Sequence, residues 1–381
     1  MATFKRKVHY LGGFDPRGAR FYHGLCEEQI GKLTGADAAT VGKRRRVGGD
    51  MQWEIWGDVQ GDDAAFLTNY EFLVWDDLVR RHWVKGGWGL IGHMVTAYRH
   101  FIAQIDWKAA RPVPAGSKLT LFYPGASVLL LPLLIALPIW IILAQLVGAI
   151  FAGIPALAIG VWATPAVLKR LHSLWLLRFI IFNDMLARGA TDPALGGRLD
   201  HFVDRIDASL AEDWDEILFV VHSNGSILAV PIMAALLDRH GGKLPDHFNF
   251  VTLGSTIQLV SLRRDASRFH ALCDTLAQGW FRWLDIGSPT DGACIPLVDP
   301  FPKRPVSRPV GLLQFSPRWF RYCDPATYKA RRRNKYETHF DYLRRLDSPS
   351  PLDFVSIVCG AQPLGKSIAA FEAQNGETRH V

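Results

Sequence analysis

An uncharged run of 50 residues, from Leu119 to Leu168, constrains the fold of this chain more than any other feature. One transmembrane helix needs about 20 apolar residues, so the run has room for two. Gly148 and Gly153 lie near its middle, where a tight reversal is expected. Prolines in the run would break helices in water but are tolerated in a membrane. The sequence therefore predicts a two-helix membrane hairpin.

Basic residues flank this run on both sides, with Lys108, Arg111 and Lys118 before it and Lys169, Arg170 and Arg178 after it. By the positive-inside rule, both ends of the hairpin stay on the cytoplasmic side. We therefore expect an integral membrane protein, in a bacterial-type inner membrane, with the rest of the chain in the cytoplasm. A re-entrant hairpin that dips into one leaflet is the main alternative, and a buried pair of soluble helices is a weaker one.

The predicted hairpin, residues 118–170, separates an N-terminal part, 1–117, from a C-terminal part, 171–381. Both parts alternate strand-like and helix-like patterns, which is typical of a doubly wound, mainly parallel α/β sheet. The amphipathic segment 171–186 is expected at the membrane surface. Strands are expected at 7–14, 53–59, 217–221, 248–253 and 280–286, and helices at 19–33, 70–83, 198–210, 227–237 and 266–277.

The stretch from Glu216 to Arg239 has the pattern of a buried strand, a sharp turn and a helix. Ser223 lies on the predicted turn, where its hydroxyl would project from the backbone beside the free N–H groups of the helix N-terminus. The pattern for such a nucleophilic serine is G-x-S-x-G, and Val221 replaces its first glycine. An ordinary strand–turn–helix with Ser223 as an N-cap is the alternative interpretation.

Three further positions could complete a serine-nucleophile site. Gly12 and Gly13 follow an early strand, where a glycine loop can supply backbone N–H groups to an oxyanion, although an ordinary turn is nearly as good an interpretation. Asp291 follows a late predicted strand, with Asp285 and Asp299 as rival acids. The histidines after Asp291 are His339, flanked by aromatic residues, and His380 in a polar tail.

Together these features resemble the serine esterase and lipase-like branch of the α/β-hydrolase superfamily, interrupted by a membrane hairpin. The resemblance implies that Ser223 is the nucleophile, His339 its general base and Asp291 the orienting acid. It also implies an oxyanion hole formed by Asn224 with Gly13 or Phe14. We expect hydrolysis of an apolar acyl ester or thioester through an acyl-serine, without a metal or organic cofactor. A catalytically inactive scaffold is the alternative.

Three other sequence features could suggest nucleotide, nucleic-acid or zinc binding, but their surroundings argue against each. Gly360–Ser367 matches the P-loop pattern G-x-x-x-x-G-K-[ST], but only 14 residues follow it, too few for the parallel sheet of a nucleotide-binding domain. The net charge of +7 includes two arginine clusters, 43–46 and 331–333, but no nucleic-acid motif accompanies them, so no nucleic-acid partner is expected. The five scattered cysteines include no C-x-x-C pair, which argues against a zinc site.

Overall fold

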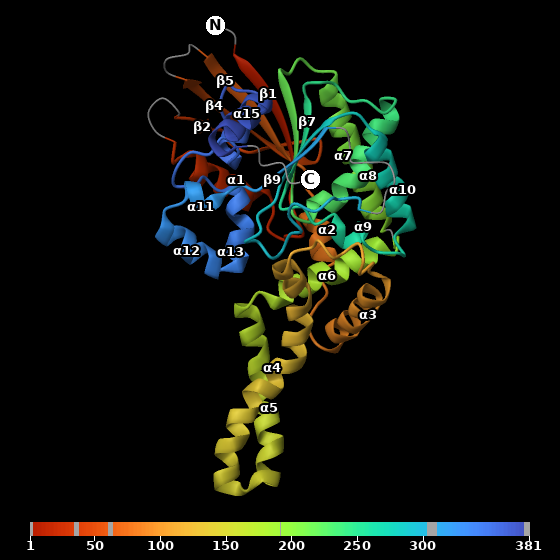
Figure 1. The fold of residues 1–381 in the computed structure, drawn as a ribbon, viewed down its shortest axis with the longest axis vertical. Helices are drawn as coiled ribbons and strands as arrows, with labels where there is room; N and C mark the ends of the chain where they lie inside the picture. Colours follow the sequence, from red (N-terminus) through yellow and green to blue (C-terminus); the bar gives the residue numbers. More distant parts are fainter. Residues whose placement is uncertain (1–2, 34–37, 60–63, 191, 303–310, 377–381) are drawn as a thin grey trace.

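The computed structural model describes residues 3–33, 38–59, 64–190, 192–302 and 311–376 (Figure 1). Its centre is a nine-stranded sheet in the order β2-β4-β5-β1-β6-β7-β8-β9, with β3 beside β4. The strands are β1 (Phe4–Leu11), β2 (Thr40–Val41), β3 (Arg45–Val47), β4 (Asp50–Val59), β5 (Ala64–Phe72), β6 (Glu216–His222), β7 (Phe248–Leu253), β8 (Arg282–Ile286) and β9 (Gly311–Phe315).

The six strands from β5 to β9 along this order are parallel, whereas β2, β3 and β4 form an antiparallel edge. The chain is therefore an α/β protein with a mixed, mostly parallel sheet. In a parallel sheet the carboxyl ends of all strands meet at one edge, so the loops after β1, β6 and β8 lie close together. These loops contain Gly13, Ser223 and Asp291 respectively.

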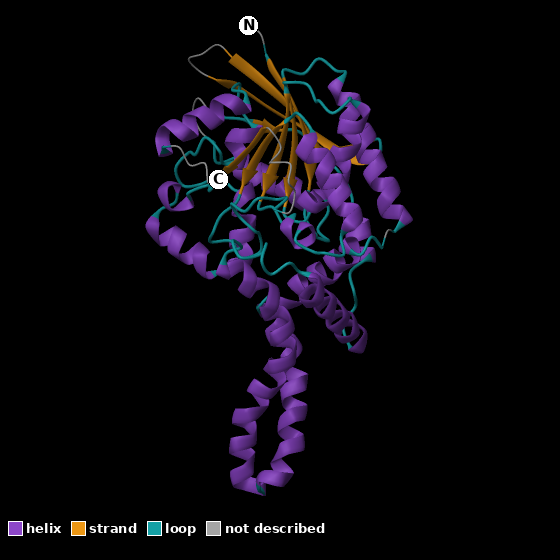
Figure 2. Ribbon diagram, turned by 45° about the vertical axis from the view of Figure 1, so that its right-hand side comes forward, coloured by secondary structure: helices purple, strands orange, loops and turns teal. Residues whose placement is uncertain are grey.

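Helices cover both faces of the sheet (Figure 2). Successive side chains of β6 point to opposite faces, as the pleat requires, so that Leu218 and Val220 enter one core while Ile217, Phe219 and Val221 enter the other. On the first face lie α1 (Ala19–Ile30), α11 (Trp319–Tyr322), α13 (Lys335–Phe340), α14 (Phe354–Val358) and α15 (Leu364–Asn375). On the second lie α7 (Pro193–Leu210), α8 (Gly225–Arg239) and α10 (Ser267–Gln278).

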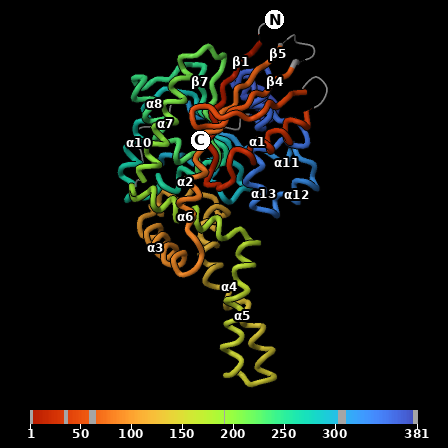
Figure 3. The backbone as a smooth tube through the Cα atoms, turned by 180° about the vertical axis from the view of Figure 1, so that it is seen from behind, coloured from red at the N-terminus to blue at the C-terminus, as the bar shows by residue number. Residues whose placement is uncertain are grey.

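The uncharged run forms two antiparallel helices, α4 (Ala115–Val147) and α5 (Ala149–Arg170), which reverse at Gly148 and extend away from the rest of the chain (Figures 1 and 3). Both are long and apolar enough to cross a membrane, by length and composition. They contact each other closely at Gly160, where a Cβ would collide with the carbonyl oxygen of Pro132. Pro124, Pro132 and Pro138 lie within α4, and Pro155 and Pro165 within α5.

Two predicted segments differ in the structure. The helix expected over 70–83 is only α2 (Asp76–Arg81), because Tyr70 and Phe72 belong to β5 and pack against other aromatic rings in the core. The segment expected at the membrane surface is α6 (Ser173–Ala187), and it lies beneath the sheet domain instead. Its apolar side chains, among them Leu177 and Phe182, are buried against protein.

Candidate functional site

Ser223 lies on a sharp turn between β6 and α8. Its backbone has φ of +55°, a left-handed conformation that is uncommon for residues other than glycine and is often found at functional sites. Its N–H donates to the carbonyl oxygen of Leu253 on β7 at 2.9 Å, which holds the turn against the next strand. The sequence-predicted serine therefore has the backbone geometry of a strand-to-helix nucleophile turn.

Two glycines permit this turn because other parts of the chain pass very close to it. A Cβ on Gly225 would lie 2.6 Å from the carbonyl oxygen of Leu11, and one on Gly13 would lie 2.9 Å from Cβ of Ser223. Val221, in contrast, is fully buried in the core under α8, and it is not among the atoms that an added Cβ on Gly225 or Gly13 would meet. The tight packing thus falls at Gly225 and Gly13, and it leaves room for valine at the position where the pattern has its first glycine.

The loop after β1 presents free backbone donors next to Ser223. Within the described part of the chain, no acceptor takes a hydrogen bond from the N–H of Gly13, Phe14 or Asn224. Phe14 is held by the indole of Trp175, whose Nε1 donates to the Phe14 carbonyl oxygen at 2.9 Å. Unpaired N–H groups from the residue after a nucleophile and from a neighbouring loop are what an oxyanion hole requires.

His339, on α13, is paired with Asp291, on the loop after β8. Nδ1 of His339 lies 2.8 Å from Oδ2 of Asp291, and both side chains are buried. The backbone N–H of Ala293 donates to the other carboxylate oxygen at 2.9 Å. Burial by itself raises the pKa of the Asp291 carboxyl, but the adjacent His339 imidazole and these hydrogen bonds outweigh it and hold that pKa below its ordinary value.

An ionised Asp291 accepts a hydrogen bond from the Nδ1–H of His339, which leaves Nε2 as the basic nitrogen of the neutral ring. Nε2 is buried and has no hydrogen-bond partner among the described residues. His222, the chain neighbour of Ser223, places its ring 4.8 Å from that of His339. The described structure contains no hydrogen bond between Ser223 Oγ and His339, so a proton transfer between them would need a movement that brings the two side chains within hydrogen-bond reach.

The rival acids have other partners. Asp285, on β8, accepts hydrogen bonds from Oγ1 of Thr252 at 2.6 Å and from Nε2 of Gln314 at 2.9 Å, and burial raises the pKa of its carboxyl. Asp299 accepts from the N–H of Phe301 at 2.8 Å, within its own loop. Neither carboxylate contacts His339, whereas Asp291 does. His380 lies outside the described residues.

Residues that the sequence did not identify also surround the site. The ring of Trp175 lies 5.8 Å from that of His339, and Tyr342 accepts a hydrogen bond from the Ser288 N–H at 2.8 Å through its hydroxyl. Nε2 of His222 donates to the His339 carbonyl oxygen at 2.9 Å. His222 and Tyr342 are detectable as polar neighbours of Ser223 and His339 in the sequence. Trp175, far from both, has no such signal.

The base of the hairpin touches the loop that carries the acid and the helix, α13, that carries the histidine. Oγ of Ser117, in the first turn of α4, donates to the carbonyl oxygen of Cys294 at 2.7 Å, three residues after Asp291. Also at the base, just after the end of α5, the ring of His172 stacks on the ring of Tyr336 with 3.9 Å between the ring centroids. Tyr336 lies three residues before His339. The two apolar helices therefore emerge directly beside the candidate site.

Burial lowers the pKa of His222 to about 3, assisted by the neighbouring His339. An unfolded histidine has a pKa near 6.5, so His222 stabilises the fold fully above about pH 6.5 and loses this contribution as the pH falls. We expect His222 to reduce the free energy of unfolding by about 2 kcal/mol at pH 5 relative to pH 8. Thermal melts of the wild type and of His222→Gln between pH 5 and pH 8 measure this loss of stability. If the stability of both proteins changed with pH in the same way, His222 could not be a neutral, buried side chain.

The P-loop-like segment has a structural role at the opposite edge of the sheet. The residues before it form helix α14 and not the strand that a P-loop follows. The carboxylate of Glu216 accepts the N–H of Leu364 at 2.7 Å, at the start of α15, where a P-loop would bind phosphate. Arg6 pairs with Glu216 and donates to the carbonyl oxygens of Gly360 and Gln362 at 3.0 and 2.6 Å. A protein carboxylate thus already occupies the anion position.

In comparisons with known proteins, no protein-family model, no curated protein and no solved structure matches the chain. Within the described residues, no group of three or more His, Cys, Asp or Glu side chains could hold a metal ion. The function must therefore be inferred from the geometry of the site itself.

Proposed function

We propose that this protein is a membrane-anchored serine hydrolase that cleaves an acyl ester or thioester through an acyl-serine intermediate. The observation that carries the proposal is the arrangement at one edge of the sheet. Ser223 occupies a left-handed strand-to-helix turn, and His339, oriented by Asp291 at 2.8 Å, has a basic Nε2 without a partner among the described residues. These are the parts needed for nucleophilic catalysis by a hydroxyl group.

In the proposed reaction, Oγ of Ser223 attacks the carbonyl carbon of the substrate while Nε2 of His339 takes the hydroxyl proton. The N–H groups of Asn224 and of Gly13 or Phe14 stabilise the resulting oxyanion. The intermediate collapses, and the alcohol or thiol leaves with the proton from His339. A water molecule then gives a proton to His339 and attacks the acyl-serine. The bond from the acyl carbon to Oγ of Ser223 breaks, His339 returns the proton to Oγ, and the carboxylic acid leaves. Asp291 stabilises the imidazolium in both steps.

We assign the chain to the α/β-hydrolase fold, with a doubly wound sheet, as part of this proposal. Support comes from the order Ser223, Asp291, His339 along the chain, which is the order in that superfamily. Further support comes from the parallel strands β1, β6, β7, β8 and β9, whose carboxyl ends carry the oxyanion loop, the serine and the acid.

The proposed substrate is apolar and partitions into the bilayer. Its support is the pair of apolar helices, α4 and α5, whose base touches the loop of Asp291 and helix α13. The basic flanks of the hairpin favour a cytoplasmic catalytic domain and an inner membrane of bacterial type. A lipid-like ester could then reach Ser223 from the membrane side.

A catalytically inactive scaffold is the second candidate, and one observation favours it. Ser223 and His339 are only 3% and 1% exposed, and no hydrogen bond joins their side chains in the described structure. An enzyme with this site must open before a substrate can reach the hydroxyl, whereas a scaffold has no such need. The two candidates differ in whether Ser223 is activated.

Labelling with a fluorophosphonate probe tests this difference directly, because the probe reacts with activated serines. We expect the detergent-solubilised wild-type protein to be labelled, and both Ser223→Ala and His339→Ala to lose labelling. Ser267→Ala, at an exposed serine at the start of α10, provides the control and should retain labelling. Folded wild-type protein that stays unlabelled, with long-chain esters also uncleaved, would favour the scaffold.

A further inference from the structure

Helix α3 (Trp88–Gln104) lies beside the base of the hairpin, on the side of the domain from which α4 and α5 emerge (Figures 1 and 3). One face of α3 packs on α6 through Leu90, Met94 and Leu177. Trp88, Val95 and Ile102 recur every seven residues, or two helical turns, on the other face, and they are 87%, 55% and 50% exposed. Large apolar side chains in such a stripe are costly to leave in water.

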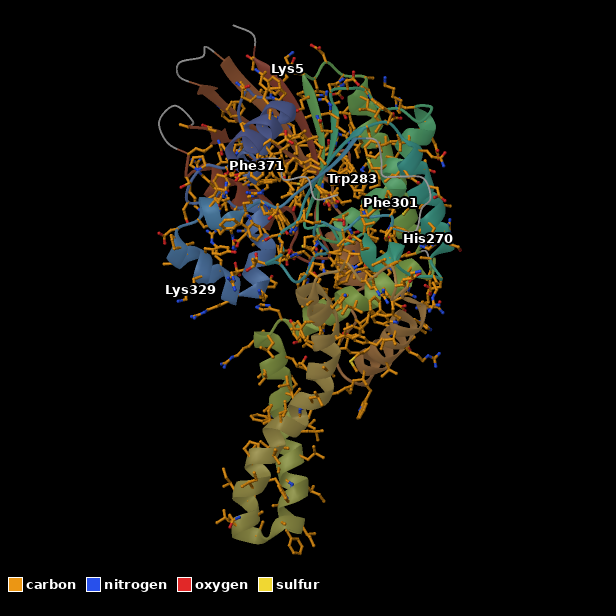
Figure 4. The ribbon with its side chains drawn as sticks, viewed as in Figure 1. Lys5, His270, Trp283, Phe301, Lys329 and Phe371 are labelled. Carbon is orange, nitrogen blue, oxygen red and sulfur yellow. The ribbon has the colours of Figure 1, made fainter. Side chains whose placement is uncertain are left out.

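Helix α12 (Pro325–Arg333) lies on the other side of the hairpin axis, at the same end of the domain (Figure 4, Lys329). It buries no residue. Lys329, Arg332 and Arg333 are exposed, and none of them has an ion pair with a described carboxylate, unlike Arg331, which contacts Asp341 at 3.7 Å. A helix with no buried residue, and with three exposed cations that lack a described carboxylate partner, presents its charge outward.

We propose that these two helices form a docking face for an anionic lipid surface. The docking face comprises Trp88, Val95 and Ile102 of α3, which enter the bilayer interface, and Lys329, Arg332 and Arg333 of α12, which contact anionic headgroups. Both helices flank an apolar hairpin with exposed side chains, so their surfaces continue a surface that already faces lipid in the proposed topology. The inference rests on the membrane anchoring proposed above.

The physical chemistry of each helix suits this partner. Tryptophan and aliphatic side chains on one face of a helix favour the interface between acyl chains and headgroups. Each lysine or arginine close to an anionic membrane surface contributes about 1 kcal/mol, and the attraction decays within a Debye length. A zwitterionic bilayer lacks this attraction, so the contact of α12 depends on lipid charge while that of α3 does not.

The face also adjoins the candidate site. α12 continues through Asn334 into α13, which carries His339. Oγ1 of Thr338 donates to the carbonyl oxygen of Arg331 at 2.7 Å and links the two helices. A lipid contact at α12 therefore holds the segment that ends at the catalytic base.

Quenching of a fluorophore by lipid nitroxides tests the docking face in the full chain, reconstituted in nanodiscs. A thiol-reactive bimane is attached at Ala330→Cys on α12, at Val95→Cys on α3, or at Ile150→Cys, which is 88% exposed at the hairpin tip. Ala370→Cys, another exposed helical alanine, lies on α15 far from the hairpin and serves as the matched control. The unmutated chain gives the labelling background of its five cysteines.

We expect Ile150→Cys and Val95→Cys to be quenched in both phosphatidylcholine and phosphatidylcholine–phosphatidylglycerol discs. Headgroup nitroxides should quench Ala330→Cys at least about threefold more in the anionic discs, and high salt or the changes Lys329→Gln, Arg332→Gln and Arg333→Gln should remove the difference. Ala370→Cys should stay unquenched. Quenching at Ile150 with none at Ala330 or Val95 would overturn the docking face but keep the anchor. No quenching at Ile150 would overturn both, and serine labelling is independent of either result.

Discussion

Replacing Asp291 with asparagine is expected to lower kcat by about 10³–10⁴-fold while the protein remains folded. The carboxylate accepts a hydrogen bond from Nδ1 of His339 at 2.8 Å, which keeps Nε2 basic. An asparagine amide can instead donate to Nδ1 and favour the tautomer with its proton on Nε2, so the ring could no longer accept the serine proton. Steady-state hydrolysis of a long-chain p-nitrophenyl ester, with a thermal melt of each variant, measures the effect.

Asp285→Asn provides the matched control for this experiment. Asp285 is also a buried carboxyl that follows α8 in the chain, but its partners are Thr252 and Gln314. Burial raises the pKa of its carboxyl, which makes a neutral amide a mild replacement. We expect kcat to change by less than about tenfold. A severe loss in Asp285→Asn together with an active Asp291→Asn would show that the acid is assigned to the wrong residue.

Gly225→Ala is expected to destabilise the fold by about 3 kcal/mol and to lower the Tm by about 5–10 °C. The added Cβ would lie 2.6 Å from the carbonyl oxygen of Leu11 and 3.0 Å from that of Gly12. These are backbone atoms of β1 and of the loop that follows it, so they cannot yield as a flexible side chain would. Relief requires β1 and α8 to separate, which also disturbs the oxyanion loop and should abolish activity.

Gly92→Ala, also in a helix, separates this steric effect from the general effect of alanine on a helix. No heavy atom lies within 4 Å of its added Cβ. Alanine has a helix propensity about 1 kcal/mol more favourable than glycine, so this variant should be neutral or slightly stabilised. Equal melting temperatures for Gly225→Ala and the wild type would contradict the close approach of β1 and α8.

The sequence predicted the elements whose signals are local. The continuous apolar run before Ser223 and the helix after it appear as β6 and α8, and β7 has the predicted bounds, Phe248–Leu253. The uncharged run forms two helices with their reversal at Gly148. Chain order and strand ends restrict the candidates to Ser223, Asp291 and His339. The structure places Asp291 and His339 in contact, and the catalytic roles of all three stay a prediction.

The remaining features depend on tertiary contacts that a single sequence does not encode locally. Tyr70 and Phe72 suit either a strand or the start of a helix, and pairing of β5 with β1 and β4 decides for the strand. Residues 354–358 resemble a strand in composition, but Asp353 caps them as helix α14. Trp175 reaches Phe14 across 161 positions of sequence, so no pattern near either residue indicates the contact.

The burial of α6 also depends on tertiary contacts that its own sequence does not indicate. Its sequence is apolar with few charges, which suits a membrane surface as well as a protein interior. Contacts with α3, α4 and α9 (Gln258–Ser261) decide between these two environments. Arg263 also reaches under the domain to pair with Asp184 of α6 at 2.7 Å, and both side chains are buried. This ion pair fixes α6 as part of the protein core next to the site.

Mass spectrometry of the protein after rapid mixing with a long-chain p-nitrophenyl ester tests the covalent mechanism most directly. We expect a burst of p-nitrophenol equivalent to the amount of active protein, and an acyl group on the peptide that contains Ser223. His339→Ala should show neither. Hydrolysis without an acyl adduct on Ser223, or an adduct on another residue, would contradict the assignment of Ser223 as the nucleophile.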